Sequence, residues 1–268
     1  MEKSTLFNGL PLYYTVTGKG HPVVLLHGLA EDAFSWNLQT EFLSSSYLII
    51  VPDLPGSGRS PLPDEVSMES LAGAVKAVLE AEGIEQAVLI GHSMGGYVTL
   101  ALAELYPQLV KALGLFHSTA YADGEEKKAT RKKNNEFIGS HGSHAFLQQA
   151  TPALFSEKSK KEHPEKVTAL IEQYKDFDPR SLIAYNKAML QRPDRSRLLE
   201  EASCPVLFII GKQDGTIPFE QSLQQSHLPD TAYIHVFEHS GHLGMLEETD
   251  KSNEALKKFL QDVYIAYF

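Results

Sequence analysis

The chain has 268 residues, of which 43% are hydrophobic and 22% are charged, as in an ordinary water-soluble globular protein. Its net charge of −10 argues against nucleic acid as a partner. No apolar run approaches the roughly 20 residues of a membrane-spanning helix, which argues against a membrane partner. Residues 1–10 lack the apolar centre of a secretory signal. We therefore expect a soluble, cytoplasmic protein.

Seven short apolar runs predict β-strands, and most of them lack polar alternation, as strands buried on both faces do. In chain order they are Leu12–Val16, Val23–His27, Leu48–Val51, Ala87–Ile90, Ala112–Phe116, Val206–Ile210 and Ala232–Phe237. Helical patterns between them cover Met68–Glu82, Tyr97–Tyr106 and Ala255–Val263. This alternation predicts an α/β fold with an open, mostly parallel sheet. Because only a short link separates Leu12–Val16 from Val23, these two runs are predicted to form an antiparallel hairpin.

The alternation of strands and helices fails between about Ser118 and Glu201. This stretch is polar and helix-prone, and it contains no convincing strand. We interpret residues 119–200 as a helical insertion over one end of the sheet. The core domain would then comprise residues 1–118 and 201–268.

Gly91-His92-Ser93-Met94-Gly95 matches the G-x-S-x-G pattern of a nucleophile elbow. A predicted strand enters the pattern and a predicted helix leaves it, so the chain must turn sharply at Ser93. The glycines are expected where side chains would collide with the neighbouring strand and helix. Ser93 is therefore the predicted nucleophile. The single cysteine, Cys204, stands before an apolar run and is interpreted as a residue at the core edge.

A serine nucleophile needs a base within hydrogen-bond reach and a carboxylate that orients this base. His242 follows the last predicted strand, directly after a glycine, and is preferred to His239. Asp214 follows the strand Val206–Ile210 and is preferred to Asp123, which lies after an earlier strand. Both preferred residues leave the carboxyl edge of the sheet. The order Ser, Asp, His is that of an α/β-hydrolase.

Acyl transfer also needs two donors for the oxyanion that forms on the substrate. The N–H of Met94, at the start of the helix after the elbow, is one candidate. The N–H of Leu29 is the other, in a turn that Gly28 permits. His27 and His92 flank the site at strand ends, and we expect them to be structural.

Five segments resemble motifs of the α/β-hydrolase superfamily and occur in that family's order. They are His27-Gly28-Leu29 with Trp36 downstream, Asp53–Ser60, Gly91–Gly96, Gly211–Asp214 and Gly241–Glu247. The resemblance covers nearly the whole chain and implies a mostly parallel eight-stranded sheet flanked by helices. It also implies a helical cap between the sixth and seventh strands, the triad of Ser93, Asp214 and His242, and neither a cofactor nor a metal. For Asp53 the resemblance implies a structural turn.

The broadest functional interpretation is cleavage of a small-molecule carboxylic ester, or a related acyl bond, through an acyl-enzyme on Ser93. Haloalkane dehalogenases and epoxide hydrolases use an aspartate at the elbow, so Ser93 argues against both. Carbon–carbon bond hydrolases and cofactor-free haloperoxidases or perhydrolases resemble this chain at the elbow and stay open as alternatives. An acyltransferase and a non-enzymatic ligand-sensing protein are further alternatives, and the intact triad argues against the second.

A substrate pocket is expected between the cap and the carboxyl edge of the sheet. Leu29, Met94 and Leu243 flank catalytic candidates, so we expect them to line it. Phe146 and Phe155 are candidates from the cap. For these two phenylalanines the alternative is packing between the cap helices.

Overall fold

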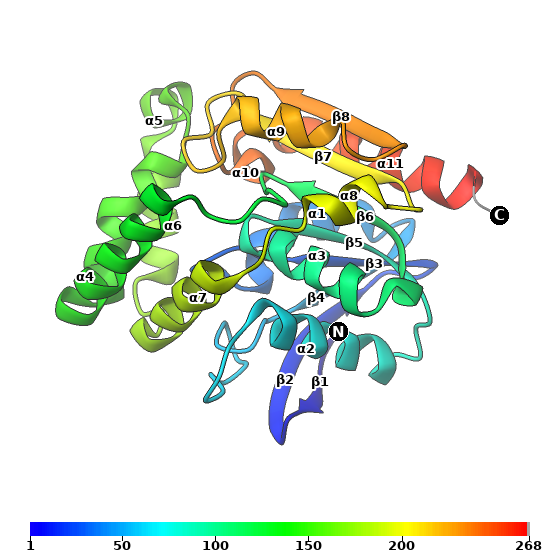
Figure 1. Ribbon diagram of the computed structural model, residues 1–268, viewed down its shortest axis with the longest axis horizontal. Helices are drawn as coiled ribbons and strands as arrows, with labels where there is room; N and C mark the ends of the chain where they lie inside the picture. Colours follow the sequence, from blue (N-terminus) through cyan, green and yellow to red (C-terminus); the bar gives the residue numbers. More distant parts are fainter. Residues whose placement is uncertain (267–268) are drawn as a thin grey trace.

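Eight strands form one mostly parallel sheet in the computed structural model, which describes residues 1–266 (Figure 1). Across the sheet their order is β1-β2-β4-β3-β5-β6-β7-β8, and β3 through β8 run parallel to one another. The strands are β1 (Glu2–Phe7), β2 (Leu10–Thr17), β3 (His21–Leu26), β4 (Tyr47–Pro52), β5 (Ala87–His92), β6 (Val110–Phe116), β7 (Val206–Gly211) and β8 (Ala232–Phe237). The predicted α/β class and eight-stranded sheet are confirmed.

The antiparallel hairpin at the start of the chain differs from the predicted one. β2 pairs with β1 on one side and β4 on the other, not with the run that begins at Val23. β1 alternates exposed and half-buried residues along a sheet edge, so it has no continuous apolar run. Asn8 and Gly9 connect the two strands with φ values of 49° and 79°. An Asn-Gly pair is the signal for such a hairpin turn.

Helices cover both faces of the sheet through two apolar clusters. α2 (Met68–Ala81) and α3 (Met94–Leu105) pack on one face, and α1 (Asn37–Leu43) and α11 (Thr249–Ala266) pack on the other. All three predicted helices are present. α3 and α11 begin earlier than predicted because their first turns are glycine-rich and polar, respectively. The other short helices are α8 (Ser196–Glu200), directly before β7, α9 (Phe219–Ser226) and α10 (Gly244–Glu247), with 3₁₀ turns at Ala33–Trp36 and Pro107–Leu109.

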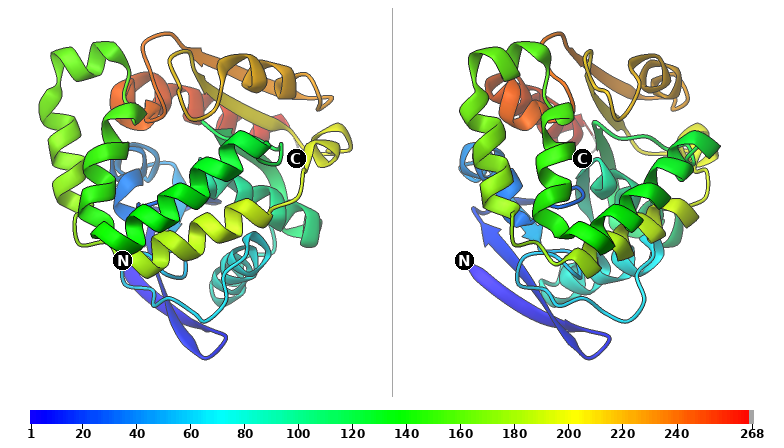
Figure 2. Two further views of the ribbon diagram at one scale, coloured as in Figure 1. Left: turned by 60° about the vertical axis from the view of Figure 1, so that its left-hand side comes forward. Right: turned by 90° about the vertical axis from the view of Figure 1, so that its left-hand side faces the viewer.

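A block of helices separates β6 from β7 along the chain. It consists of α4 (Glu125–Ala150), a 3₁₀ turn (Thr151–Leu154), α5 (Glu157–Glu162), α6 (Pro164–Tyr174) and α7 (Pro179–Gln191). These helices gather on one side of the sheet, with α4 and α7 side by side (Figures 1 and 2). α4 bends at Gly142, where φ is 80°. The division into a core domain and a cap at residues 119–200 stays a prediction. Across residues 1–266, no helix combines the length and apolar character that crossing a membrane requires.

Tyr185 ties α7 to the turn that follows β4. Its side chain is fully buried, and its hydroxyl lies 2.8 Å from the carbonyl oxygen of Pro55 and 2.9 Å from Oγ of Ser57. The tyrosine hydroxyl can donate to the carbonyl while it accepts from the serine. One buried hydroxyl thus fixes the inserted helices against the core.

We expect Tyr185→Phe to lower the free energy of unfolding by about 1–3 kcal/mol, because it leaves buried polar groups without their partner. Chemical denaturation followed by circular dichroism measures the loss. Tyr121→Phe is the control, since within residues 1–266 the half-buried hydroxyl of Tyr121 makes no hydrogen bond. Equal stability of the two variants would contradict this role for Tyr185.

Candidate active site

Ser93 lies at the turn between β5 and α3. Its backbone has φ 50° and ψ −114°, a combination that non-glycine residues rarely adopt. The Ser93 N–H donates to the Phe116 carbonyl in β6 at 3.0 Å, and Oγ of Ser118 donates to the Ser93 carbonyl at 2.8 Å. The neighbouring strand therefore holds the strained turn in place. Ser93 itself is partly exposed at the carboxyl end of β5.

The glycines around Ser93 have no room for a side chain. A Cβ at Gly95 would lie 2.3 Å from the carbonyl oxygen of Leu26, at the end of β3. A Cβ at Gly91 would lie 2.2 Å from the carbonyl carbon and oxygen of Gly95. Both distances are far below van der Waals contact. α3 can therefore pack against the ends of β3 and β5 only with glycine at these positions.

Asp214 and His242 form a buried hydrogen-bonded pair. Asp214 follows β7 and His242 follows β8, so both leave the same edge of the sheet as Ser93. Nδ1 of His242 lies 2.8 Å from Oδ2 of Asp214. The other carboxylate oxygen accepts the N–H groups of Thr216 and Ile217 at 2.8 and 2.9 Å. With its proton on Nδ1, the neutral ring leaves Nε2 as the basic nitrogen.

The Asp214 carboxylate is ionised at neutral pH. Burial alone would raise its pKa, but the charge and hydrogen bonds of His242 and His117 hold the pKa well below its usual range. A carboxyl pKa that folding lowers stabilises the fold above the unfolded pKa. This contribution is lost as the pH falls through the folded pKa, so it is fully present around neutrality.

His117 is a second histidine on the Asp214 carboxylate, and the sequence analysis missed it. Its Nδ1 lies 3.3 Å from Oδ2 of Asp214, and its two ring nitrogens face the N–H groups of Gly211 and Gly244, each at 3.2 Å. Burial, and to a lesser extent the nearby His242, lowers the pKa of the His117 ring although Asp214 opposes this shift. A neutral ring carries one proton, and the Asp214 oxygen favours its position on Nδ1. Nε2 then accepts from the Gly244 N–H, whereas Nδ1 cannot accept from the Gly211 N–H. His117 directly follows β6, so the strand-end rule used for Asp214 could have found it.

The ligand-type atoms of His117, Asp214 and His242 all lie within 4.8 Å of one another. Such a group can be compared with a metal site, because imidazole and carboxylate are common zinc ligands. The contacts of 2.8 and 3.3 Å to Oδ2 of Asp214 are, however, of hydrogen-bond length. We interpret the group as a hydrogen-bonded acid–base unit.

The alternative acid, Asp123, is paired with arginines, and the alternative base, His239, lies at the surface. Asp123 is buried and accepts from Arg131 at 2.6 Å and from Arg192 at 2.9 Å. Burial would raise the Asp123 pKa, but the two guanidinium groups lower it. His239 is exposed. Neither residue contacts the Asp214–His242 pair in the described part of the chain.

Asp53 and Cys204 also have structural surroundings. The Asp53 carboxylate accepts the N–H groups of Ala33 and Arg59 at 3.0 and 3.2 Å, so it shapes the turn after β4. Cys204 precedes β7 and therefore lies at the opposite end of that strand from Asp214. Burial raises the pKa of the Cys204 thiol, which disfavours the nucleophilic thiolate.

The turn after β3 holds the backbone around Leu29 in a fixed orientation. The Gly28 N–H donates to Oε2 of Glu31 at 2.7 Å, and Nδ1 of His27 lies 2.9 Å from the Gly28 carbonyl. Since the Gly28 N–H is occupied, Leu29 is the better oxyanion donor of the two. Among residues 1–266, no acceptor is recorded for the N–H of Leu29 or of Met94.

The five predicted pocket residues belong to three apolar clusters. Leu29 and Phe146 meet in a small cluster between the inserted helices and the core. Leu243 and Phe155 pack in the cluster on the α11 face of the sheet, and Met94 packs in the cluster on the α2–α3 face. Leu29 and Phe146 thus come together, whereas Phe155 packs in the core cluster. The lining of a pocket by these five side chains stays a prediction.

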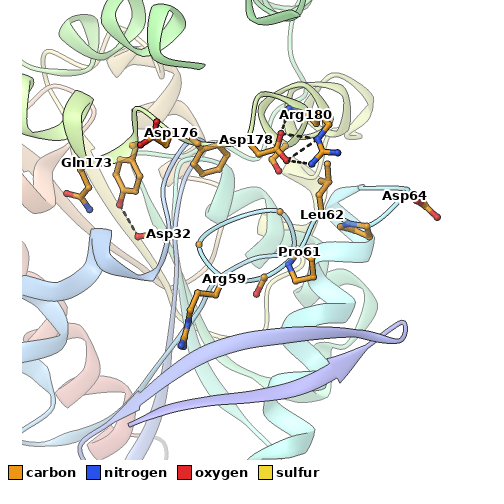
Figure 3. Close-up of a pocket in the computed structure, with 16 residues that line it drawn as sticks. Asp32, Arg59, Pro61, Leu62, Asp64, Gln173, Asp176, Asp178 and Arg180 are labelled. Atoms are coloured by element: carbon orange, nitrogen blue, oxygen red, sulfur yellow. Dashed lines mark hydrogen bonds and ion pairs between the residues drawn. The ribbon is translucent and has the colours of Figure 1, made fainter. Parts of the chain in front are cut away.

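A cavity of about 750 Å³ lies between the turn after β4 and the α6–α7 connection (Figure 3). It is lined by Asp32, Asp178 and Arg180, and not by Ser93 or His242. Oη of Tyr174 donates to Asp32 at 3.0 Å across this cavity, which joins the inserted helices to the core. Tyr174 also belongs to the cluster of Leu29 and Phe146, so the cavity borders that cluster.

The loop that carries His242 is attached to the inserted segment. The His242 N–H donates to the Leu154 carbonyl at 2.7 Å. The Glu247 carboxylate accepts the N–H of Gly241 and the N–H of Ser156, both at 2.8 Å. A Cβ at Gly241 would lie 2.6 Å from the Leu154 carbonyl oxygen, so this close approach, as well as the bend, requires glycine.

Comparison with known proteins gives one family. Residues 23–255 match the model of the alpha/beta hydrolase family. In fold, the chain is similar to a thermophilic esterase from Thermogutta terrifontis, with a TM-score of 0.92 and 30% identity, covering 98% of this chain and 99% of that one.

Two curated relatives have different activities. The chain is 28% identical to a 2-hydroxy-6-oxononadienedioate/2-hydroxy-6-oxononatrienedioate hydrolase of Paraburkholderia phymatum, over 94% of this chain and 91% of that protein. It is also 28% identical to the dihydrolipoyllysine-residue acetyltransferase component of the acetoin cleaving system of Cupriavidus necator, over 94% of this chain and 67% of that protein. Family membership alone therefore does not determine which bond is cleaved.

We expect Gly95→Ala to destabilise the protein by about 3 kcal/mol or more, because backbone must move to admit the new Cβ. Gly139→Ala is the matched control, since Gly139 is exposed in α4 and a Cβ there meets nothing within 4 Å. That variant should gain about 0.5–1 kcal/mol from the better helix propensity of alanine. Thermal melts of the two variants measure this difference in stability. Similar melting temperatures would show that α3 has room to move.

Proposed function

This chain belongs to the alpha/beta hydrolase family, and we propose that it is a serine hydrolase that cleaves a small carboxylic ester through an acyl-enzyme on Ser93. The observation that carries this proposal is the buried contact of 2.8 Å between Asp214 and His242, at the sheet edge where Ser93 occupies a strained elbow. A paired carboxylate and imidazole beside a serine form the arrangement that activates a hydroxyl. The similarity to an esterase at 30% identity favours an ester as the substrate.

In the proposed reaction, Oγ of Ser93 attacks the ester carbonyl carbon while Nε2 of His242 accepts the hydroxyl proton. The ionised Asp214 holds Nδ1 protonated and stabilises the imidazolium that forms. The N–H groups of Leu29 and Met94 donate to the oxyanion. Collapse of this intermediate releases the alcohol, which takes the proton from His242. Water then attacks the acyl-enzyme with His242 again as base, and the acid product leaves Ser93.

We further propose that residues 119–200 act as a cap and that the acyl or alcohol group binds beneath it. Leu29, Met94, Leu243, Phe146 and Phe155 are the proposed lining residues. The contact of Leu29 with the Phe146 cluster supports this assignment, because it joins an oxyanion candidate to the inserted helices. The proposed chemistry uses side-chain and backbone groups alone and needs no cofactor.

Carbon–carbon bond hydrolysis is the second candidate. The Paraburkholderia phymatum relative is named as a hydrolase of 2-hydroxy-6-oxononadienedioate, and this similarity supports the second candidate. The two candidates differ in the leaving group, which is an alcohol in one and a carbanion equivalent in the other. A panel of p-nitrophenyl esters of increasing acyl length, assayed beside a 2-hydroxy-6-oxohexa-2,4-dienoate, separates them. Turnover of the dienoate without turnover of any ester would replace the ester proposal by the second candidate.

We expect Ser93→Ala to fold normally and to lose turnover by a factor on the order of 10⁶, because it removes the nucleophile. A fluorophosphonate probe should label the wild-type protein at Ser93, as peptide mass spectrometry would show, and should not label the variant. Retained labelling or retained hydrolysis in purified Ser93→Ala would assign the nucleophile to another residue.

Asp214→Asn should lower turnover by about 10⁴-fold, or about 5 kcal/mol of barrier, because an amide favours the wrong histidine tautomer. Substrate binding should change little. Asp123→Asn is the control, since Asp123 is equally buried but paired with Arg131 and Arg192. We expect the control to melt earlier and to keep its turnover at low temperature. The reverse pattern would place the acid after β6.

A further inference from the structure

Glu31 and His92 form a buried pair that the proposed reaction does not use. His92 ends β5 directly before Ser93, and Glu31 lies in the turn after β3. Nδ1 of His92 lies 3.1 Å from Oε2 of Glu31, and the His92 side chain is 2% exposed and that of Glu31 8%. Burying two charged groups is costly, so such a pair is weakly explained by stability alone.

The contacts of His92 determine how many protons its ring carries. Nδ1 faces the Glu31 carboxylate, and Nε2 faces the backbone carbonyl oxygen of His242 at 2.9 Å. A carbonyl oxygen can only accept, and an ionised carboxylate can only accept. With Glu31 ionised, both ring nitrogens must donate, which makes His92 an imidazolium cation.

The pKa directions agree with this count of protons. Burial alone would raise the pKa of Glu31, but the charge and hydrogen bond of His92 lower it to about 2. Burial alone would lower the pKa of His92, but Glu31, the His242 carbonyl and the more distant Asp214 raise it. The other titratable groups around the ring are His242 and His117, at centroid distances of 5.0 and 6.3 Å.

Each end of the pair holds a different loop of the candidate site. Oε2 of Glu31 accepts the Gly28 N–H at 2.7 Å and so orients the His27–Gly28 peptide, which adjoins the peptide that supplies the N–H of Leu29, the proposed oxyanion donor. Nε2 of His92 holds the backbone carbonyl of His242, the proposed base. His92 is also the covalent neighbour of Ser93. One ion pair thus connects the segments that supply the nucleophile, the base and an oxyanion donor.

We propose that Glu31 and His92 are positioning residues, which set the distance between the oxyanion turn and the His242 loop through a buried carboxylate–imidazolium pair. The inference rests on the proposed function, because it assigns roles to Leu29 and His242 in that reaction. Glu31 and His92 contact each other and the backbone groups of Gly28 and His242, so they act through these groups.

The charge state of His92 can be tested without any assay of activity. In protein labelled with ¹⁵N-histidine, the His92 ring should show two bonded protons at neutral pH, assigned by the signals that disappear in His92→Gln. In Glu31→Gln the ring should lose one of these protons, because the carboxylate charge that raises its pKa is gone. A wild-type His92 ring with a single proton would overturn the ion pair.

The positioning role is tested by the kinetics of the same variant on the best ester. Glu31→Gln keeps an oxygen acceptor for the Gly28 N–H, so the fold should survive. We expect kcat to fall about 10- to 100-fold through misplacement of the reacting groups, with KM little changed. Glu82→Gln is the matched control, because Glu82 pairs with Lys3 and Tyr14, each at 2.7 Å, on the β1–β2 hairpin. That variant should lose stability but keep kcat, and equal kcat for the two variants would overturn the role.

The pH dependence gives an independent readout. A histidine pKa raised by folding stabilises the native state below the unfolded pKa, and this contribution is lost as the pH rises through the folded pKa. Loss of the His92 proton breaks the pair and should lower kcat. Because Glu31 raises the pKa of His92, the alkaline loss of kcat should begin at lower pH in Glu31→Gln than in the wild type. An alkaline limb that does not move would contradict the proposal.

Failure of the proposed function would be recognised separately. If the wild type cleaves neither esters nor the dienoate, the ring-proton spectra still decide the charge of His92. The backbone amide signals of Leu29 and His242 then report the positioning role, and they should shift in Glu31→Gln and not in Glu82→Gln. Unshifted signals would overturn it.

Discussion

The close contact of α3 with the ends of β3 and β5 is the constraint on which the candidate site depends. At Gly95 a Cβ would lie 2.3 Å from the Leu26 carbonyl oxygen, so backbone meets backbone with nothing between them. This contact sets the start of α3 beside the turn that continues from β3. The N–H groups of Met94 and Leu29 belong to these two segments. Because no side chain forms the contact, it cannot relax through a rotamer change.

Carboxyl side chains extend this order from the elbow to the surrounding loops. Glu31 accepts the Gly28 N–H, Asp214 accepts two N–H groups of its own loop, and Glu247 accepts the N–H groups of Gly241 and Ser156. Hydrogen bonds to charged acceptors are shorter and stronger than those between neutral groups. Loops that would otherwise depend on weak packing are thus fixed at the backbone. The Asp214 carboxylate also contacts His242 and His117, and the Glu31 carboxylate also contacts His92.

Much of the fold and of the candidate site could be predicted because the signals are local in the sequence. Apolar runs predict the parallel strands, and loops after those strands predict where Ser93, Asp214 and His242 leave the sheet. β1 escaped prediction because an edge strand with one exposed face has only weak alternation, although Asn8-Gly9 signals its turn. His117 follows β6 and could have been found by the rule that found Asp214, whereas Glu31 escaped because its contact with His92 joins residues far apart in the chain. The separation between Glu31 and His92, for example, is 61 residues, and only the order of strands in the sheet brings them together.

In the proposed enzyme, the attachment of the His242 loop to the inserted segment would link substrate choice to catalytic geometry. Leu154 accepts the His242 N–H, and Phe155, a proposed pocket residue, lies between Leu154 and Ser156, the two residues that bind this loop. A change in that segment that reshapes the pocket therefore also acts on the backbone of the proposed base. Phe146, on α4, belongs to a cluster that contacts Leu29 and has no such connection to His242. In the proposed enzyme, a substitution on α4 would consequently change substrate specificity with less effect on the position of His242 than a substitution at residues 154–156.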